Sequence, residues 1–275
     1  MRRLLATSLM LVLQGSVCAH ADQLPVDGPV TTSLAGKFAP VAGPSVLRVI
    51  CEKDGTGGTG FVHSSGVVIT AEHVVTPCAA PELRLIFSSG KSLRVKNAVL
   101  DDPRDLALLW PSELISVPTL KLSTAPQLEI GDQVATWGFP SGYSGLRPLL
   151  SVGYLSGDDK PKGERQQWVI NAAFNSGNSG GPVIRLEDGA VIGVVSSKLA
   201  PLPEYAASSL EALSKMRSGM VFKGKNAAGE LVDISEAQVV AQVLNHLREQ
   251  TQLVLGYAVK LGELRAFLME NNISP

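Results

Sequence analysis

The chain has 275 residues and a net charge of −1 at neutral pH, which argues against a nucleic-acid partner held by a basic surface. Its length suits one large domain or two smaller ones. With 27 glycines, 17 prolines and few aromatic residues, the composition favours many short strands joined by turns over long helices.

The first 21 residues have the three parts of a secretory signal peptide. A charged start, Arg2-Arg3, precedes a mostly apolar run over residues 4–17 and the small-residue cleavage site Ala19-His20-Ala21. The apolar run is too short and too interrupted for a comfortable membrane span, although an uncleaved anchor or a buried strand is the alternative. We expect residues 1–21 to be removed, and we expect no other segment to span a membrane.

Export changes the expected chemistry of the three cysteines. Cys18 is lost with the signal peptide, and the residues before it lack the pattern of a lipid-anchored cysteine. The remaining pair, Cys51 and Cys78, is a disulfide candidate in an oxidising compartment, the alternative being two buried thiols. A bridge between them would stabilise the fold by roughly 3 kcal/mol, because it restricts the unfolded chain.

Strand signals begin after a stretch of irregular sequence. Residues 22–43 are rich in proline and glycine and show no apolar period, so we expect a flexible leader there. Runs of β-branched and aromatic residues then predict a first set of strands over residues 45–53, 59–63, 67–70, 83–87, 92–100 and 106–110.

A proline- and serine-rich stretch over residues 111–126 separates this set from a second one. The second set is predicted over residues 133–139, 149–155, 167–174, 182–186 and 190–196, where Asp188-Gly189 marks a hairpin turn. Two sets of short strands with regular turns indicate two antiparallel barrels or sandwiches.

The pattern becomes helical after Lys198. Residues 203–216 have helical composition, and Ser235 with Gln238 forms a capping-box pattern ahead of an apolar stripe at helical spacing. We therefore predict a mostly helical insertion over residues 200–252, placed between the last two strands of the second barrel.

The chain then returns to the barrel pattern. Residues 253–260 predict a last strand and residues 261–270 a closing helix. The expected domain is 44–270, with a first barrel over about 44–122 and a second over about 128–199 plus 253–270.

The hexapeptide GNSGGP, from Gly177 to Pro182, places a serine between glycines. The backbone there turns sharply and exposes a hydroxyl beside amide N–H groups, which an acyl-transfer nucleophile needs. The hexapeptide also fits the G-x-S-x-G elbow of α/β-hydrolases, so Ser179 alone does not decide between two classes of hydrolase.

Two upstream segments supply the other groups of a catalytic triad. His73, in TAEHVV, follows a predicted strand and small residues. Asp105, in DPRDLALL, opens an apolar run, where its carboxylate needs a hydrogen-bond donor such as an imidazole. Together with Ser179, these two residues are candidates for a catalytic triad.

The order of these residues separates the two classes. An α/β-hydrolase requires serine, acid and histidine in that order, here Ser179, Asp188 or Asp233, and then His246. Asp188 lies in a predicted hairpin turn and His246 on a predicted amphipathic helix, and the chain lacks alternating strands and helices. The order His, Asp, Ser is therefore favoured, and His63 is expected to be a strand-end residue beside a turn.

These segments together resemble the trypsin-like serine proteases, most of all the bacterial HtrA/Deg type. The similarity runs in family order through GTGFVHSSGVVITAEHVV, DPRDLALL, GFPSGYSG, INAAFNSGNSGGPVI, DGAVIGVVSS and LGYAVKLGELRAFL. The resemblance implies a mostly β fold of two antiparallel six-stranded β-barrels (chymotrypsin-like), with the active site between them and a C-terminal helix. It also implies an oxyanion hole formed by the backbone N–H groups of Gly177 and Ser179.

The chain departs from that family in two respects. No PDZ domain is expected after the closing helix, so cage assembly and regulation through such domains are not carried over. The insertion follows the strand that in the family lines the primary specificity pocket. It is expected to restrict the cleft, to form an interface or to pack on the barrel.

The resemblance places five residues at or near the substrate pocket: Ala173, Asn175, Val195, Ser196 and Ser197. None of them is acidic, so a buried lysine or arginine of a substrate would lack a partner. We expect the residue before the cut bond to be apolar and small or medium in size.

The sequence thus predicts an exported serine endopeptidase, periplasmic or secreted, that acts on unfolded or extended polypeptides without a cofactor. The alternative is a non-catalytic protease-fold protein that binds partners through the cleft or the insertion. The histidines and cysteines lack metal-ligand spacing, and Gly55–Gly58 lacks the lysine and helix of a phosphate-binding loop. The oligomeric state is left open.

Overall fold

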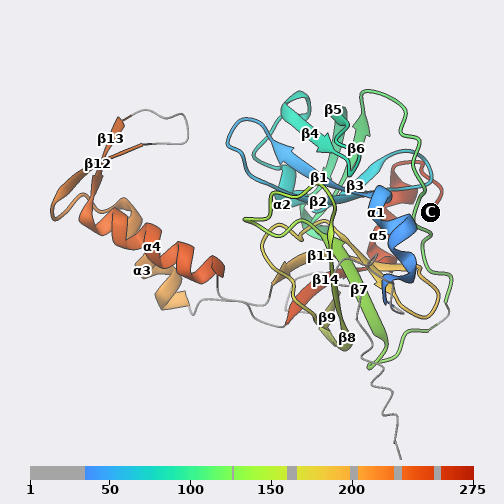
Figure 1. Ribbon diagram of the computed structural model, residues 1–275. Helices are drawn as coiled ribbons and strands as arrows, with labels where there is room; N and C mark the ends of the chain where they lie inside the picture. Colours follow the sequence, from blue (N-terminus) through green and yellow to red (C-terminus); the bar gives the residue numbers. More distant parts are fainter. Residues whose placement is uncertain (1–34, 126, 160–165, 199–203, 226–230, 251–254) are drawn as a thin grey trace, which may run out of the picture. The chain divides into compact units, whose positions relative to one another are not determined.

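The computed structural model describes residues 35–125, 127–159, 166–198, 204–225, 231–250 and 255–275 (Figure 1). The predicted signal peptide, its cleavage site and Cys18 lie outside these residues. In the described part of the chain, no helix combines the length and the apolar character that crossing a bilayer requires.

Six antiparallel strands close the first barrel in the order β1-β2-β3-β6-β5-β4. Their bounds are β1 Val46–Cys51, β2 Gly57–Val62, β3 Val68–Thr70, β4 Leu83–Ile86, β5 Ser92–Asp101 and β6 Leu106–Pro111. Aliphatic side chains such as Leu47, Val49, Leu85 and Leu109 fill its interior, since alternate residues of each strand face inward.

Six further antiparallel strands close the second barrel in the order β10-β11-β14-β9-β8-β7. Their bounds are β7 Gln133–Gly138, β8 Leu149–Asp159, β9 Gln167–Asn171, β10 Pro182–Arg185, β11 Val191–Lys198 and β14 Gly256–Lys260. The last strand of this barrel, β14, pairs with β11 and β9, although the whole insertion separates it from them in the sequence. The predicted fold class is confirmed.

The segment before β1 is ordered over its second half. Residues Ala35–Phe38 form the 3-10 helix η1, and Ala39–Ser45 form helix α1, which has Pro40 in its first turn. Phe38, Val41 and Ala42 lie three and four residues apart, so they share one helix face and pack on the core. The expectation of a flexible leader over residues 22–43 is therefore wrong for 35–43.

One cluster of buried side chains joins the two barrels and the closing helix α5, Leu261–Glu270. It includes Phe61 and Leu106 of the first barrel, Trp137 of the second barrel, and Phe267 of α5. The cleft between the barrels is thus supported from behind by continuous apolar packing, which holds the two walls in a defined relation.

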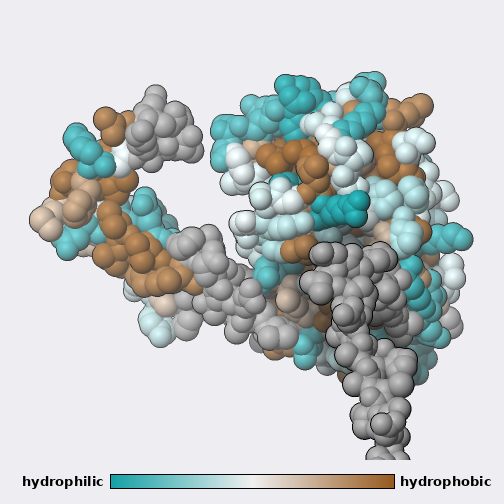
Figure 2. All heavy atoms as spheres, viewed as in Figure 1, coloured by the Kyte–Doolittle hydropathy of each residue, from teal (hydrophilic) through white to brown (hydrophobic). Residues whose placement is uncertain are grey.

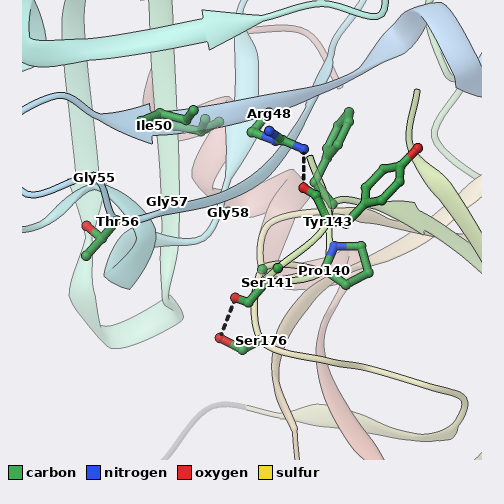
Figure 3. A pocket seen from close by; sticks show the side chains of 14 residues that line it. Arg48, Ile50, Gly55, Thr56, Gly57, Gly58, Pro140, Ser141, Tyr143 and Ser176 are labelled. Atoms are coloured by element: carbon green, nitrogen blue, oxygen red, sulfur yellow. Dashed lines mark hydrogen bonds between the residues drawn. The ribbon is translucent and has the colours of Figure 1, made fainter. Parts of the chain in front are cut away.

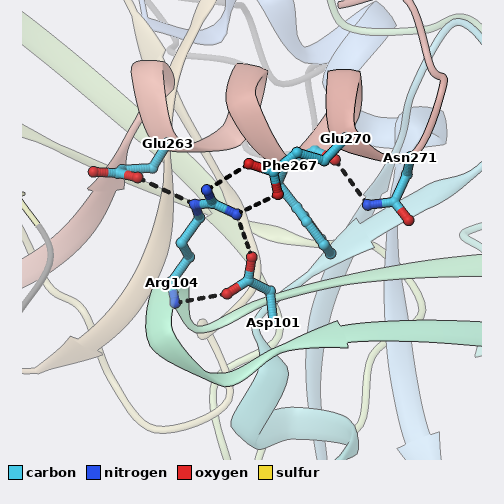
Figure 4. Close-up of polar contacts among 6 residues, drawn as sticks. All are labelled: Asp101, Arg104, Glu263, Phe267, Glu270 and Asn271. Carbon is cyan, nitrogen blue, oxygen red and sulfur yellow. Dashed lines mark hydrogen bonds and ion pairs between the residues drawn. The ribbon is translucent and has the colours of Figure 1, made fainter.

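An ion-pair cluster around Arg104 fastens α5 to the first barrel (Figure 4). The guanidinium donates to both carboxylate oxygens of Glu270 at 2.7 Å, to Asp101 at 2.5 Å and to Glu263 at 3.3 Å. The hydrogen bonds with Glu270 raise the pKa of Arg104 most, followed by the bond with Asp101. The residue after Arg104 is Asp105, so the cluster also steadies the turn that carries this carboxylate.

In its described residues, the insertion contains two helices and a β-hairpin. Helix α3 spans Glu204–Lys215, the strands are β12 Val221–Lys225 and β13 Leu231–Ser235, and helix α4 spans Glu236–Gln250. The hairpin was not predicted. The capping box is confirmed, because Ser235 N donates to Gln238 Oε1 at 2.9 Å and Gln238 N donates to Ser235 Oγ at 3.3 Å.

The insertion exposes many apolar side chains, which Figure 2 shows as brown atoms along this segment. They come from both helices and both strands. Those at least two-fifths exposed include Tyr205, Met216, Met220, Val221, Phe222, Leu231, Val240, Val243, Leu244 and Leu247. A surface of this kind is typical of a contact face.

Cys51 ends β1, and Cys78 follows the short helix α2, Glu72–Val75. The two Cα atoms are 5.8 Å apart and the sulfur atoms lie at bonding distance, a Cα spacing usual for a disulfide. This bridge would join the first strand to the segment that carries His73.

Replacing both Cys51 and Cys78 with alanine is expected to lower the free energy of unfolding by roughly 3 kcal/mol, because the unfolded chain regains the freedom that the bridge removes. Urea denaturation of the oxidised protein and of the double variant measures the difference. A reductant should destabilise the wild type by a similar amount and leave the double variant unchanged. Equal stability of the oxidised and reduced wild type would contradict the bridge.

Candidate active site

His73 stands at the edge of the first barrel on α2, directly after β3 and Ala71. Its neighbours Val74 and Val75 are buried in the barrel core, which fixes the helix, while the imidazole remains 48% exposed. The histidine is therefore held by its backbone and presents its ring at the surface.

Asp105 lies in the turn between β5 and β6, after the 3-10 helix η3, Asp102–Arg104. Its φ of 53° is the left-handed conformation, which aspartate tolerates better than most residues. The carboxylate Oδ1 accepts from His73 Nδ1 at 2.8 Å and from the His73 backbone N–H at 3.2 Å. Because an ionised carboxylate only accepts, Nδ1 carries the ring proton and Nε2 is left as a base.

The Asp105 carboxylate is buried and ionised. Burial raises its pKa, but the hydrogen bond and the attraction from His73, together with the hydrogen bond from Ser196, outweigh burial, so the pKa lies below its usual range. The carboxylate therefore stays charged at neutral pH and can stabilise a positive charge on the imidazole.

Ser179 lies in a loop in which the glycines before and after it adopt backbone conformations that other residues avoid. Gly177 has φ +92°, and a Cβ there would lie 2.4 Å from Phe139 O; Gly180 has φ +84°, and a Cβ would lie 2.1 Å from Thr59 O. Only glycine fits at these two positions. The close approach to β2 also lets Thr59 N donate to Ser179 O at 2.8 Å, which ties the serine to the first barrel.

The Ser179 hydroxyl donates to the backbone oxygen of Ser196 at 2.9 Å. Within the described residues it makes no hydrogen bond with His73. The structure therefore brings His73 and Asp105 into direct contact, whereas it shows Ser179 with a different partner for its hydroxyl. Catalytic hydrogen bonds are often formed only when substrate is bound.

The backbone N–H groups of Gly177 and Ser179 are the predicted oxyanion donors. Neither group donates to an acceptor among the residues that the structure describes. The peptide plane before Gly177 is fixed from the other side, because Ser176 O accepts from Ser141 N at 2.7 Å. Since N–H and C=O point in opposite directions across a trans peptide, the Gly177 N–H is turned away from Ser141.

The loop over residues 139–145 that orients this peptide is itself anchored to the first barrel (Figure 3). Arg48 donates through Nη2 to Tyr143 O at 2.7 Å and to Gly145 O at 3.0 Å. Thr59 Oγ1 accepts from Phe139 N at 3.0 Å and donates to Gly177 O at 2.7 Å. Arg48 of β1 and Thr59 of β2 thus support both the loop over residues 139–145 and the segment from Ser176 to Ser179, which we call the oxyanion loop.

We expect Gly177→Ala to lower kcat by about 10²- to 10³-fold, the usual cost of losing one oxyanion donor. The added Cβ would meet Phe139 O and would force the peptide to rotate. Gly131→Ala is the matched control, because Gly131 also has a positive φ, +104°, but open space around it. The kcat of both variants on one peptide substrate, compared with wild type, checks this. Equal losses in the two variants would show that backbone strain, and not the oxyanion loop, is responsible.

Two of the predicted pocket residues have other roles. The side chain of Ser196 donates to Asp105 Oδ2, so it orients the carboxylate and is buried away from a pocket. Val195 is 1% exposed and packs in the core of the second barrel. Both side chains are buried, so the prediction that Val195 and Ser196 lie along a wall of the substrate pocket stays a prediction for their backbone atoms.

The other three predicted pocket residues remain candidates. Ala173 is exposed and Asn175 is partly buried beside the Ser179 loop. Asn178 connects them to that loop, since its Nδ2 donates to Ala173 O at 3.2 Å and its N donates to Asn175 O at 3.0 Å. The backbone of Ser197 pairs with Tyr257 of β14; its side chain lies outside the described part of the structure.

The residues of the rival hydrolase order lie in ordinary structural positions. Asp188 is in the β10–β11 turn and pairs with Arg185 at 2.5 Å, and the His246 backbone belongs to α4. His63 is buried at the end of β2, where its Nδ1 lies 2.9 Å from Ser65 Oγ and burial lowers its pKa. No three histidine, cysteine, aspartate or glutamate side chains gather as metal ligands in the described residues.

Comparison with known proteins shows what this chain is similar to. Residues 58–194 match the model of the trypsin-like peptidase domain. A protein of Chlamydia muridarum named probable periplasmic serine endoprotease DegP-like is 34% identical over 152 residues, which are 52% of this chain and 28% of that protein. The mitochondrial serine protease HTRA2 of Drosophila virilis is 27% identical over 212 residues, which are 72% of this chain and 49% of that protein. The chain thus covers at most about half of these relatives.

Solved structures agree on the fold. The crystal structure of the Rv3671c protease from M. tuberculosis in its active form has a TM-score of 0.58 at 19% identity and covers 91% of this chain and 96% of that chain. The inactive form of the same protease has a TM-score of 0.56 at 21% identity. The two-barrel fold therefore extends over nearly the whole of that solved chain.

Proposed function

We propose that this chain, whose residues 58–194 carry a trypsin-like peptidase domain, is a serine endopeptidase that hydrolyses peptide bonds through an acyl-enzyme at Ser179. The observation that carries the proposal is the contact between His73 Nδ1 and the buried, ionised Asp105 at 2.8 Å. This contact leaves Nε2 as a base, and the loop of Ser179 offers the N–H groups of Gly177 and Ser179, which donate to no acceptor among the described residues.

The first half of the reaction begins when the Ser179 hydroxyl leaves its hydrogen bond to Ser196 O and donates to His73 Nε2 instead. As Oγ attacks the substrate carbonyl carbon, its proton moves to Nε2, and the carbonyl π electrons move to the oxygen. The Gly177 and Ser179 N–H groups stabilise that oxyanion. When the tetrahedral intermediate collapses, the C–N bond breaks, and the imidazolium gives its proton to the departing amine.

The second half repeats these steps with water as nucleophile. His73 takes a proton from the water, a C–O bond forms at the acyl carbon, and a second oxyanion is held by the same N–H groups. Collapse breaks the bond to Ser179 Oγ, which recovers its proton from the imidazolium. Asp105 remains ionised throughout, since its role is to orient the imidazole and to stabilise its positive charge.

The relatives and the sequence support an exported protein. Proteins similar to this chain are named periplasmic serine endoproteases, and the first 21 residues have the pattern of a signal peptide. The pairing of Cys51 with Cys78 suits an oxidising compartment. We place the mature protein in the periplasm or outside the cell, acting on unfolded or extended polypeptides.

The residue before the cut bond is proposed to be apolar and small or medium in size. Ala173 and Asn175 carry no charge, so a substrate lysine or arginine would bury its charge beside them without a partner. A peptide library with every residue at this position should be cleaved mainly after alanine, valine and residues of similar size. Dominant cleavage after arginine or lysine would refute this preference.

One observation favours a second candidate, a protease-fold protein that binds partners without cleaving them. The Ser179 hydroxyl is bonded to Ser196 O, and the insertion exposes apolar side chains. Incubation with unfolded casein decides between the two. An endopeptidase yields new peptide N-termini from casein, whereas a binding protein retains intact casein. The latter result would overturn the proposed activity.

A further inference from the structure

A groove of about 480 Å³ lies between the barrels beside the oxyanion loop (Figure 3). One wall is the middle of β1 and the β1–β2 connection, from Arg48 to Gly58. The other wall is the loop over residues 139–143 together with Ser176 and Gly177. The groove is thus continuous with one oxyanion donor.

The groove comes close to Ser179 on the side of the first barrel. Its residue Gly58 approaches Ser179 so closely that a Cβ would lie 2.8 Å from Ser179 O. Its wall belongs to the first barrel, as does His73, which must protonate the departing amine. The segment of a substrate that follows the cut bond would therefore run along this wall.

Arg48 brings a positive charge into this groove, where its guanidinium lies over the ring of Phe139 with Cζ 4.8 Å from the ring centre. Its Nη2 donates to the backbone oxygens of Tyr143 and Gly145, whereas Nε and Nη1 donate to no acceptor among the described residues, and no carboxylate of these residues lies within 4.0 Å. The acidic residues of the β1–β2 connection are already engaged, because Asp54 accepts from Thr56 and Glu52 pairs with Arg84. The Nε–H and Nη1–H groups of this partly buried guanidinium remain able to donate a charge-assisted hydrogen bond to a carboxylate.

We propose that this groove binds the substrate segment after the cut bond and that Arg48 selects a carboxylate within the first three residues of that segment. The inference rests on the proposed function. The carboxylate is either an aspartate or glutamate side chain or the α-carboxylate of a short substrate, and the two sources offer the guanidinium the same chemistry.

Cleavage of matched peptides tests the proposal. All peptides share the acyl side and carry aspartate, asparagine or lysine at the second residue after the cut bond, each with a C-terminal amide. The aspartate peptide is expected to have a kcat/KM about tenfold above that of the asparagine peptide, and the lysine peptide the lowest value. A fourth peptide, neutral and ending in a free carboxylate at the third residue, shows the preference if the α-carboxylate is the ligand. Equal kcat/KM for all four peptides would overturn the proposal.

Variants of Arg48 test whether this residue causes the preference for a carboxylate after the cut bond. Arg48→Met also loosens the loop over residues 139–145, so its kcat is expected to fall for every peptide. The ratio of aspartate to asparagine peptide within one variant cancels that common loss, and it should fall from about ten to about one. Arg48→Lys should keep part of the ratio, and Lys91→Met, which removes an exposed cation of the same barrel outside the groove, should keep all of it. An unchanged ratio in Arg48→Met would contradict the assignment.

Binding separates this inference from the proposed activity. In Ser179→Ala, fluorescence anisotropy with the labelled aspartate and asparagine peptides should show an affinity ratio of about ten that Arg48→Met abolishes. If the wild type cleaves no peptide but this affinity ratio is present, the proposed catalysis is refuted and the proposed binding of a carboxylate in the groove is supported. If all peptides are cleaved at equal rates and bind with equal affinity, the proposed selection by Arg48 is refuted and the proposed catalysis is supported.

Discussion

Replacing Ser179 with alanine is expected to lower kcat for peptide cleavage by about six orders of magnitude, the loss typical of removing a triad nucleophile. The proposed acyl-enzyme forms on the Ser179 hydroxyl, so its removal removes the nucleophile. The fold should persist, because the Ser179 hydroxyl makes one hydrogen bond, to Ser196 O, and its backbone oxygen still accepts from Thr59. Steady-state kinetics on a quenched-fluorescent peptide measures the loss.

Ser156→Ala is the matched control for this variant. Ser156 is exposed on β8, and its hydroxyl donates only to the backbone of Tyr154 within the described structure. This change should leave kcat within twofold of wild type. Should Ser179→Ala retain more than about one hundredth of wild-type kcat, Ser179 is not the nucleophile.

Replacing Asp105 with asparagine is expected to lower kcat at neutral pH by about 10⁴-fold. Asparagine keeps the shape of the side chain, but its amide can donate to Nδ1 and thereby stabilise the tautomer whose Nε2 carries the proton. The base is then absent, and the imidazolium formed during the reaction loses its negative partner. Kinetics of purified Asp105→Asn on the same peptide checks the result.

Asp102→Asn serves as the control, since it removes an exposed carboxylate from the same turn. Its kcat should remain within twofold of wild type. If both variants lose kcat equally, the effect arises from the charge of the turn and not from the contact between Asp105 and His73.

The lowered pKa of Asp105 also predicts a pH dependence of stability. Burial raises this pKa, and the bonds from His73 and Ser196 lower it further than burial raises it. Because the folded pKa lies below the unfolded one, ionised Asp105 stabilises the fold above its unfolded pKa, and this contribution is lost as the pH falls through the folded pKa. The Asp105→Asn variant should lack this part of the acid dependence in urea denaturation.

Much of the fold was predictable because its signals are local. The strands of the two barrels follow runs such as 106–110 and 133–139, in which β-branched and aliphatic residues stand between turn residues. The capping box of Ser235 is also a short-range pattern. The candidate triad was found because its residues lie in specific short motifs. The order His, Asp, Ser then separated two classes of hydrolase.

The features that were not predicted depend on contacts between residues that are far apart in the sequence. The roles of Ser196 and Val195 depend on which face of β11 meets Asp105, 91 residues away from Ser196 in the chain. Helix α1 is ordered because Phe38 and Ala42 pack against the core cluster. No local sequence pattern predicts this contact.

The support of the oxyanion loop was equally invisible in the sequence. Arg48 and Tyr143 are 95 residues apart, and a lone arginine on a predicted strand gives no sign of a partner. The hairpin β12–β13 was missed because exposed positions such as Val221 and Leu231 lack a buried face that would produce an alternating pattern.

Intact-protein mass spectrometry after treatment with a fluorophosphonate tests the central claim most directly, namely that His73, steered by Asp105, activates Ser179. We predict a single adduct that peptide mapping assigns to Ser179, and slow or absent labelling of His73→Ala. An unmodified wild-type protein, or an adduct on another residue in a protein that still cleaves peptides, would contradict the account.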